Sequence, residues 1–206
     1  VLFRSLTVAY AGRNETDDMV KMVRMINRDL KTPLCIDSTD PDTIEAALKC
    51  YSGKALINSI NLEDGGIKAA KILDIAARYG ASVIALTIDE SGMAETASRK
   101  VEAACRLVEI AKKHGLKSSD VMIDTLTFTL GSGDAKYFNA AVETFNAISE
   151  IKRKMPEVFT LLGVSNCSYG LKPGARKVLN SVYLYNAVKH GLDAAIFHAG
   201  KVVQLD

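Results

Sequence analysis

Val158-Phe159-Thr160-Leu161-Leu162-Gly163-Val164 is followed directly by Ser165-Asn166-Cys167-Ser168. The first seven residues form an apolar run with the length of a buried strand, and the residues after it are small or polar. An amide side chain therefore comes at the carboxyl end of a predicted strand. Three earlier stretches close a short apolar run with Asp or Asn in the same way: Pro33-Leu34-Cys35-Ile36-Asp37-Ser38, Ala55-Leu56-Ile57-Asn58-Ser59 and Val121-Met122-Ile123-Asp124.

Short apolar runs alternate with longer amphipathic segments along the whole chain. The runs predict strands over residues 6–10, 33–38, 55–60, 82–88, 121–124, 158–164 and 194–197. The segments between them predict helices near residues 14–30, 41–51, 67–79, 97–114, 135–154 and 175–190. This alternation is typical of repeated βαβ units around a parallel sheet that is buried on both faces.

Seven consecutive units without a dinucleotide or phosphate-loop fingerprint favour a TIM (β/α)8 barrel, although the pattern also allows an open, doubly wound sheet. The 206 residues suit a single domain spanning residues 1–206. The chain begins at Val1 and ends shortly after a predicted strand. We therefore expect a barrel domain that is truncated at both ends and lacks its first βα unit and last helix. Its exposed strand edges would favour marginal stability or self-association.

The amino-acid composition limits the classes of function that fit this chain. A net charge of +2 and an even spread of Lys and Arg give no sign of nucleic-acid binding. No apolar stretch approaches the roughly 18 to 20 residues of a membrane-spanning helix. The four cysteines are far apart and lack C-x-x-C spacing, which fits free thiols in a cytoplasmic protein. The sequence contains no H-E-x-x-H or paired Cys/His spacing, so no metal site is predicted.

Four polar residues are the candidate site: Asp37, Asn58, Asp124 and Asn166. In a barrel of this type the carboxyl ends of the strands meet at one mouth, where the active site lies. Two acids and two amides would form a cup of hydrogen-bond donors and acceptors that suits a flat, polar-edged heteroaromatic ligand such as a pterin. Asp37 and Asn58 could instead be helix caps, because Ser and a helical segment follow each.

Cys167, beside Asn166, has two interpretations. It could be a nucleophile, although no orienting base accompanies it in the sequence, and a small structural thiol is the favoured interpretation.

The motifs resemble those of the pterin-binding methyltransferases that use methyltetrahydrofolate. This family includes the folate domain of cobalamin-dependent methionine synthase and the methyltetrahydrofolate:corrinoid/iron-sulfur protein methyltransferases. The resemblance covers nearly the whole chain. It is carried by Pro33-Leu34-Cys35-Ile36-Asp37-Ser38, Ile44-Glu45-Ala46-Ala47-Leu48-Lys49, Ile57-Asn58-Ser59, Ile123-Asp124, Gly163-Val164-Ser165-Asn166, Val182-Tyr183-Leu184-Tyr185-Asn186-Ala187 and Gly191-Leu192-Asp193-Ala194-Ala195-Ile196.

The resemblance implies a barrel of the dihydropteroate-synthase-like type that binds 5-methyltetrahydrofolate. It also implies transfer of the N5 methyl group to a Co(I) corrinoid on a cobalamin domain or corrinoid protein, as in methionine biosynthesis and one-carbon metabolism. Asp37, Asn58 and Asp124 would hold the pterin ring. Asn166 would reach the N5 region, and Asp124 and Asn166 would be the catalytic residues. Related stand-alone enzymes also imply a homodimer.

Two positions differ from the family pattern. Thr7 stands where the family has Asp on its second strand, and Thr125 follows Asp124 where the family has Pro. The Gly-Glu-Arg-like first strand is absent from this sequence. Two alternative functions remain open: dihydropteroate synthase, whose Ser-Arg-Lys motif is replaced here by Ser165-Asn166-Cys167, and a non-catalytic pterin- or folate-binding module.

Overall fold

A computed structural model describes residues 4–8, 12–29, 31–203 and 205 of the chain. Seven parallel strands form one sheet, in which each strand pairs with its neighbours in sequence order. They are β1 (Arg4–Leu6), β2 (Leu34–Asp37), β3 (Leu56–Ile60), β4 (Ser82–Leu86), β7 (Val121–Asp124), β8 (Phe159–Gly163) and β9 (Ala194–Ile196).

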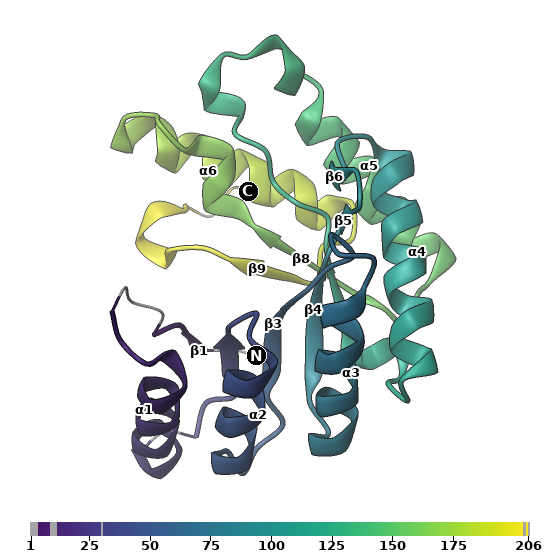
Figure 1. Ribbon diagram of the computed structural model, residues 1–206. Coiled ribbons are helices and arrows are strands. Elements are labelled where there is room, and N and C mark those ends of the chain that lie inside the picture. Colours follow the sequence, from purple (N-terminus) through teal and green to yellow (C-terminus); the bar gives the residue numbers. More distant parts are fainter. Residues whose placement is uncertain (1–3, 9–11, 30, 204, 206) are drawn as a thin grey trace.

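The sheet curls into a partial barrel, with β1 and β9 as its two edges in the described part of the chain (Figure 1). The strand order never reverses, so the doubly wound alternative is wrong and the expected barrel type is confirmed. The first strand begins earlier than predicted, at Arg4, because Arg4–Leu6 is in register with Leu34–Ile36. Residues 9 and 10 of the predicted strand lie outside the described residues.

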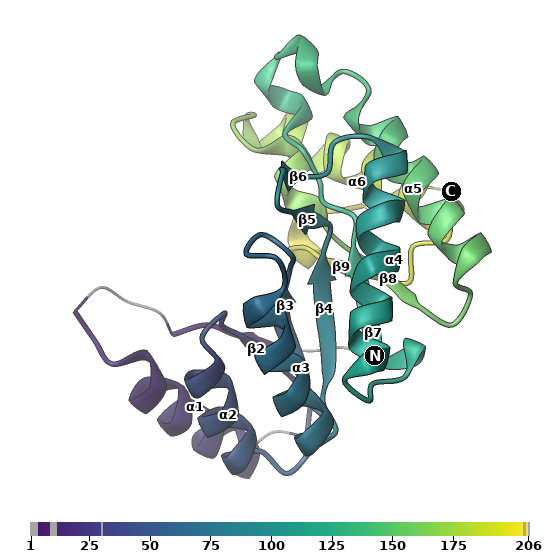
Figure 2. The same ribbon diagram turned by 45° about the vertical axis from the view of Figure 1, so that its right-hand side comes forward.

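In the described part of the chain, six α-helices cover the outer face of the sheet (Figure 2). Each helix contacts the next one along the chain, as expected of successive βα units with short connections. They are α1 (Glu15–Asp29), α2 (Pro41–Cys50), α3 (Ile67–Tyr79), α4 (Ala97–Lys113), α5 (Ala140–Lys154) and α6 (Pro173–Lys189). No helix in the described ranges is both long and apolar enough to cross a membrane.

The fifth helix is shorter than predicted. It begins at Ala140 instead of Ala135, and the 3-10 turn Ala135–Tyr137 precedes it. The Asp134 carboxylate accepts the backbone N–H of Lys136 at 2.9 Å, which starts this separate turn. Aspartate commonly redirects the backbone in this way, because its side chain competes for nearby N–H groups.

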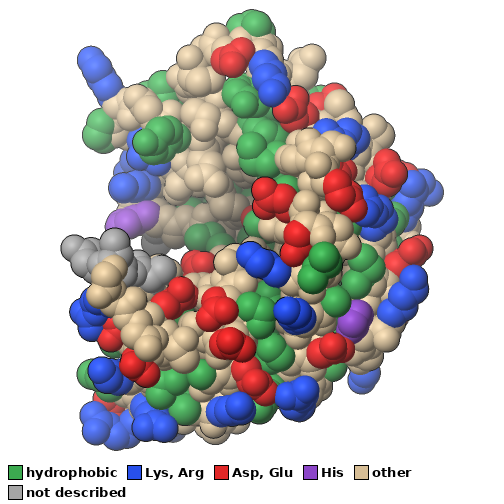
Figure 3. Space-filling view, in the orientation of Figure 1, with side chains coloured by type: hydrophobic (Ala, Val, Ile, Leu, Met, Phe, Trp, Pro, Cys, Tyr) green, Lys and Arg blue, Asp and Glu red, His purple; other side chains and the backbone are tan. Residues whose placement is uncertain are grey.

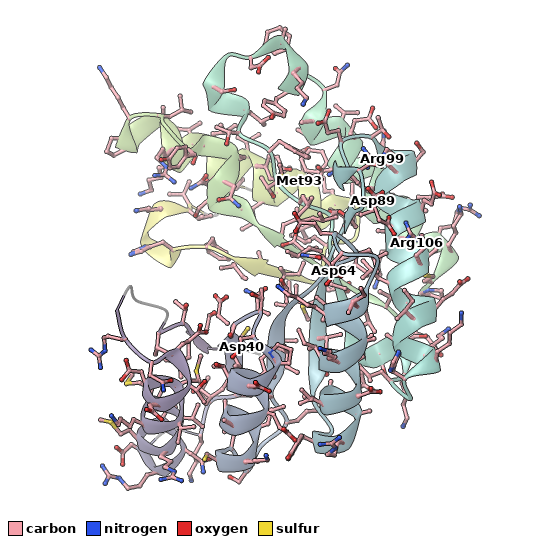
Figure 4. All side chains as sticks on the ribbon, in the orientation of Figure 1. Asp40, Asp64, Asp89, Met93, Arg99 and Arg106 are labelled. Carbon is pink, nitrogen blue, oxygen red and sulfur yellow. The ribbon has the colours of Figure 1, made fainter. Side chains whose placement is uncertain are left out.

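The strand predicted over residues 82–88 ends at Leu86, and a small antiparallel hairpin follows it, made of β5 (Ile88–Asp89) and β6 (Gly92–Met93). Two arginines of α4 bind it: Arg99 contacts Asp89 at 2.8 Å, and Arg106 contacts Glu90 at 2.7 Å (Figure 4). The hairpin therefore fixes the start of α4 against the end of β4.

The helix α2 begins at a side-chain cap. Asp40 accepts the backbone N–H of Thr43 at 3.0 Å and its hydroxyl at 2.6 Å, and Pro41 occupies the first helical position (Figure 4). These hydrogen bonds from Thr43 lower the pKa of Asp40. Because the pKa of Asp40 is lowered in the folded state, its ionised carboxylate stabilises the fold at pH values above the ordinary pKa of Asp. This stabilisation is lost as the pH falls through the folded-state pKa of Asp40.

Asp40→Ala is expected to lower the free energy of unfolding by about 1 kcal/mol, because the Thr43 N–H loses its partner. Such a change shifts the melting temperature of a chain of this size by roughly 2 to 4 °C, which thermal denaturation followed by circular dichroism resolves. Asp42→Ala is the matched control, since this exposed carboxylate lies in the same turn without the capping bond. Equal melting temperatures for the two variants would contradict a capping role.

Candidate functional site

The strands present alternate side chains to opposite faces of the sheet, and this alternation defines the inner face. A small apolar cluster made of Cys35, Leu56, Ile84 and Leu161, with Met122 packed against it, lies on one face. The opposite side chains of the same strands, such as Ile36, Ile57 and Ile123, belong to the large core beneath the helices. The small cluster therefore fills the inside of the curled sheet.

Counting two residues onward from this inner cluster leads to polar residues at the carboxyl ends of the strands. Asp37 follows Cys35, Asn58 follows Leu56, and Asp124 follows Met122. Asp37 and Asn58 are direct register partners on β2 and β3, and Asp124 is the last residue of β7. The structure thus places these three predicted residues in one inward-facing polar layer.

Asp37 and Asn58 are not helix caps. The caps of the helices that follow them are Asp40 and Gly66, so that alternative interpretation is wrong. Asp37 accepts the hydroxyl of Ser5 at 3.2 Å. The described residues offer the side-chain amide of Asn58 no hydrogen-bond partner, while the backbone carbonyl of Asn58 accepts the N–H of Ser38 at 2.9 Å. Both side chains are half-buried and free to contact a ligand.

Asp124 is held more tightly by its surroundings than Asp37 and Asn58 are. Its backbone carbonyl accepts the N–H and the hydroxyl of Thr87, at 3.1 and 3.2 Å. Its carboxylate accepts the N–H of Leu126 at 2.8 Å, a residue with a φ of 62°, and Thr144 donates to the Leu126 carbonyl at 3.1 Å. A non-glycine residue with positive φ is strained and persists where its surroundings enforce it. Burial raises the pKa of Asp124 to about 6, against the opposing effects of the Leu126 N–H and the Lys100 charge.

Asn166 lies beyond the strand, in the 3-10 turn Val164–Ser168 that follows β8, and it is exposed. An ideal Cβ at Gly163 would lie 3.3 Å from the amide nitrogen of Asn166. Gly163 occupies the inward position two residues after Leu161, so the missing side chain leaves room for the amide at the polar layer. Asn166 is therefore brought to the same mouth from a turn, and not from a strand end as the sequence implied.

This turn is held by α6. Arg176 donates to the Ser165 carbonyl and to the Ser168 hydroxyl, both at 3.1 Å, and Ser168 donates to the buried Asn180 side chain at 2.7 Å. Neither Arg176 nor Asn180 is among the site residues predicted from the sequence. Their signal was only positional, since both lie four residues apart on one face of the helix after the Asn166 turn.

Lys100 is the other residue that the sequence analysis missed. It lies in the first turn of α4, is fully buried, and donates through Nζ to the carbonyl of Thr125, the residue after Asp124. A signal was present in the sequence, because Lys100 is in line with the apolar residues Ala104, Leu107 and Ala111 of the same helix. A lone lysine in a helix ordinarily extends into solvent, so this alignment alone does not predict a buried side chain.

Cys167 is buried, and its thiol lies 3.5 Å from the Asn180 side-chain oxygen. Burial raises the pKa of this thiol to about 12, which keeps it protonated and supports the structural interpretation over the nucleophilic one. Within the described ranges, no group of three or more His, Cys, Asp or Glu side chains is placed to hold a metal ion.

The molecule has a hollow on the side where β1 and β9 lie in Figure 1, and acidic side chains lie beside this hollow (Figure 3). Two other surface cavities, of about 660 and 510 Å³, lie elsewhere: between α4 and α5, and at the amino ends of the strands. The second is lined by residues such as Ser82 and Val121, which begin β4 and β7. Since ligands of barrel enzymes bind at the carboxyl ends, neither cavity is the candidate site.

Comparisons with known proteins identify the family of the chain. Residues 7–198 match the family model of pterin-binding enzymes. The chain is 42% identical over 205 residues to methionine synthases of Mycobacterium tuberculosis and Mycobacterium leprae, covering 98% of this chain and 17% of each relative. It therefore spans about a sixth of the length of these relatives.

Solved structures of two dihydropteroate synthases share the fold. The enzyme from Thermus thermophilus superposes with a TM-score of 0.73 at 18% identity, covering 97% of this chain and 78% of that one. The enzyme from Stenotrophomonas maltophilia gives a TM-score of 0.69 at 17% identity, covering 97% and 77%. Given the family match across nearly all of its length and its 42% identity to the mycobacterial relatives, the chain belongs to the family of pterin-binding enzymes.

Proposed function

We propose that this chain binds 5-methyltetrahydrofolate and transfers its N5 methyl group to a Co(I) corrinoid. The observation that carries the proposal is the inward polar layer of Asp37, Asn58 and Asp124 at one end of the curled sheet. The identity of 42% to methionine synthases supports a methyltransferase, whereas the dihydropteroate synthases share the fold at only 17 to 18% identity.

The polar layer suits the edge of a pterin ring. A carboxylate such as Asp124 can accept two parallel N–H bonds, from a ring N–H and the neighbouring amino group, and an amide such as Asn58 can donate and accept beside them.

Methyl transfer breaks the bond between N5 and its methyl carbon, and the electron pair of that bond stays on N5. A tertiary amine leaves poorly unless N5 gains a proton, so the site must stabilise positive charge at N5. In the proposed mechanism the side-chain oxygen of Asn166 accepts a hydrogen bond from the protonated N5, with water as the proton source. The corrinoid, carried by another domain of a longer polypeptide or by a separate protein, supplies the cobalt nucleophile that accepts the methyl group.

The test has two readouts on the purified chain. Calorimetric titration with 5-methyltetrahydrofolate is expected to show saturable one-to-one binding, and added cob(I)alamin is expected to lose its Co(I) absorbance as it is methylated. Binding without methylation would support the non-catalytic folate-binding alternative. A folded chain that binds no reduced folate would contradict the proposal outright.

A further inference from the structure

Lys100 places a positive charge where the fold does not favour one. It lies in the first turn of α4, where the helix dipole already concentrates positive charge, and its side chain is fully buried. Burial of an ammonium group costs free energy unless it is paired and hydrogen-bonded. Lys100 thus departs from two local preferences, because it is a basic residue at the amino end of a helix and a charged side chain in the core. Such departures are expected at functional sites, where another contact compensates for their cost.

The contacts of Lys100 converge on the Asp124 loop. Its Nζ donates to the Thr125 carbonyl and lies 4.8 Å from the centroid of the Phe128 ring, a cation–π distance. Between these two partners, the N–H of Leu126 binds the Asp124 carboxylate at 2.8 Å. The ammonium therefore fixes the segment whose backbone orients the carboxylate.

Lys100 cannot readily move away from this position, because the start of α4 is held from outside. Arg99 pairs with Asp89 of the hairpin at 2.8 Å (Figure 4), and the N–H of Ala97 donates to the Glu143 carboxylate at 2.6 Å. The first turn of α4 is thus anchored to the β5–β6 hairpin and to α5. Its buried lysine is presented to the Asp124 loop in a fixed geometry.

The charges around Lys100 come from three elements. Burial lowers the pKa of Lys100 to about 8, while the charges of Asp124 on β7, Glu143 on α5 and Glu95 before α4 raise it. Glu95 is itself paired with Lys136 at 2.7 Å. In return, the Lys100 charge lowers the pKa of Asp124, so each group favours the ionised form of the other. Tyr183 also faces Asp124, and burial raises the pKa of that phenol to about 12, which leaves it neutral.

We infer that Lys100 is a positioning residue of the pterin site: it fixes the Thr125 carbonyl and keeps Asp124 as a carboxylate that can accept the N–H groups of the ligand. The inference rests on the proposed function, since the role is defined by the ligand that Asp124 binds. It assigns a function to a helix residue that lies behind the strand ends and does not touch the ligand.

Two variants and one control test the inference. Lys100→Met removes both the charge and the donor, Lys100→Gln removes the charge but keeps a donor, and Lys113→Met removes an exposed lysine from the last turn of the same helix. The titration of Asp124 is followed by carbon NMR of aspartate-labelled protein without ligand. Affinity for 5-methyltetrahydrofolate is measured by calorimetry from pH 6 to 9, with folding checked by circular dichroism.

Both Lys100 variants are expected to raise the pKa of Asp124, because its carboxylate loses the neighbouring positive charge. Affinity at pH 7 should then fall by about twofold or more, because a smaller share of the carboxylate is ionised at that pH, and should recover toward pH 9 as Asp124 ionises. Lys113→Met should match the unchanged protein in both measurements. A role confined to packing would instead weaken binding equally at every pH.

An unmoved Asp124 titration in folded Lys100→Met, or a loss of affinity that does not recover with pH, would overturn the inference. These outcomes are separable from failure of the proposed function. If the unchanged chain binds no reduced folate, the proposed function fails, while the ligand-free titration still decides whether Lys100 controls the ionisation of Asp124.

Discussion

Asp124→Ala is expected to abolish measurable binding of 5-methyltetrahydrofolate in calorimetric titration. Hydrogen bonds to a charged group each contribute about 1.5 to 3 kcal/mol, and the carboxylate is proposed to accept two of them. Loss of both corresponds to a weakening of about 100-fold or more.

The alanine variant also removes the partner of the Leu126 N–H and leaves the Lys100 charge without its neighbour, so its fold requires an independent check. Asp124→Asn separates the two effects. Its side-chain oxygen can still accept from Leu126, but it lacks the charge and offers the ligand a donor in place of an acceptor.

Asp134→Ala is the matched control for this series, because Asp134 is an exposed aspartate of the same loop, after the strand end. We expect Asp124→Asn to stay folded and to bind at least tenfold more weakly than the unchanged chain, a loss of about 1.4 kcal/mol. The control should bind normally. Undiminished binding by folded Asp124→Asn would remove this carboxylate from the proposed site.

The sequence was sufficient to predict the inward polar residues of β2, β3 and β7. Side chains along a strand alternate between the two faces of the sheet, so residues two positions apart lie on the same face. A polar residue that closes an apolar run therefore faces the same way as the residue two positions before it. Asp37, Asn58 and Asp124 each follow an inner-cluster residue in this way, and their places in the layer were predictable from the pattern. The βα repeat likewise predicted the order of the strands.

Contacts between elements could not be predicted in this way. Lys100 contacts the Asp124 loop across 25 positions of sequence, and Arg176 contacts the Asn166 turn from the next helix. The local sequence does not indicate the partner of either side chain, since both belong to residue types that most often lie at the surface. The strained backbone at Leu126 also follows from the tertiary hydrogen bonds around it, and not from its own sequence preference.

Asn166→Ala is expected to separate binding from methyl transfer. The side chain is exposed and has no hydrogen-bond partner among the described residues, so its loss should weaken binding of 5-methyltetrahydrofolate only a few-fold. The backbone carbonyl of Asn166 accepts the Tyr169 N–H at 3.2 Å, and alanine retains this bond, so the turn is expected to persist. Any large effect would then come from the missing amide.

The rate of methyl transfer should fall about 100-fold in Asn166→Ala, the size of effect seen when one group that stabilises transition-state charge is removed. Single-turnover loss of Co(I) absorbance, at saturating folate and with added cob(I)alamin, measures this rate apart from binding. Asn146→Ala, at an exposed asparagine of α5, is the control and should react like the unchanged chain. A variant that loses binding and rate in the same proportion would place Asn166 among the ring-holding residues. One that keeps its full rate would leave the charge at N5 to be stabilised by another group.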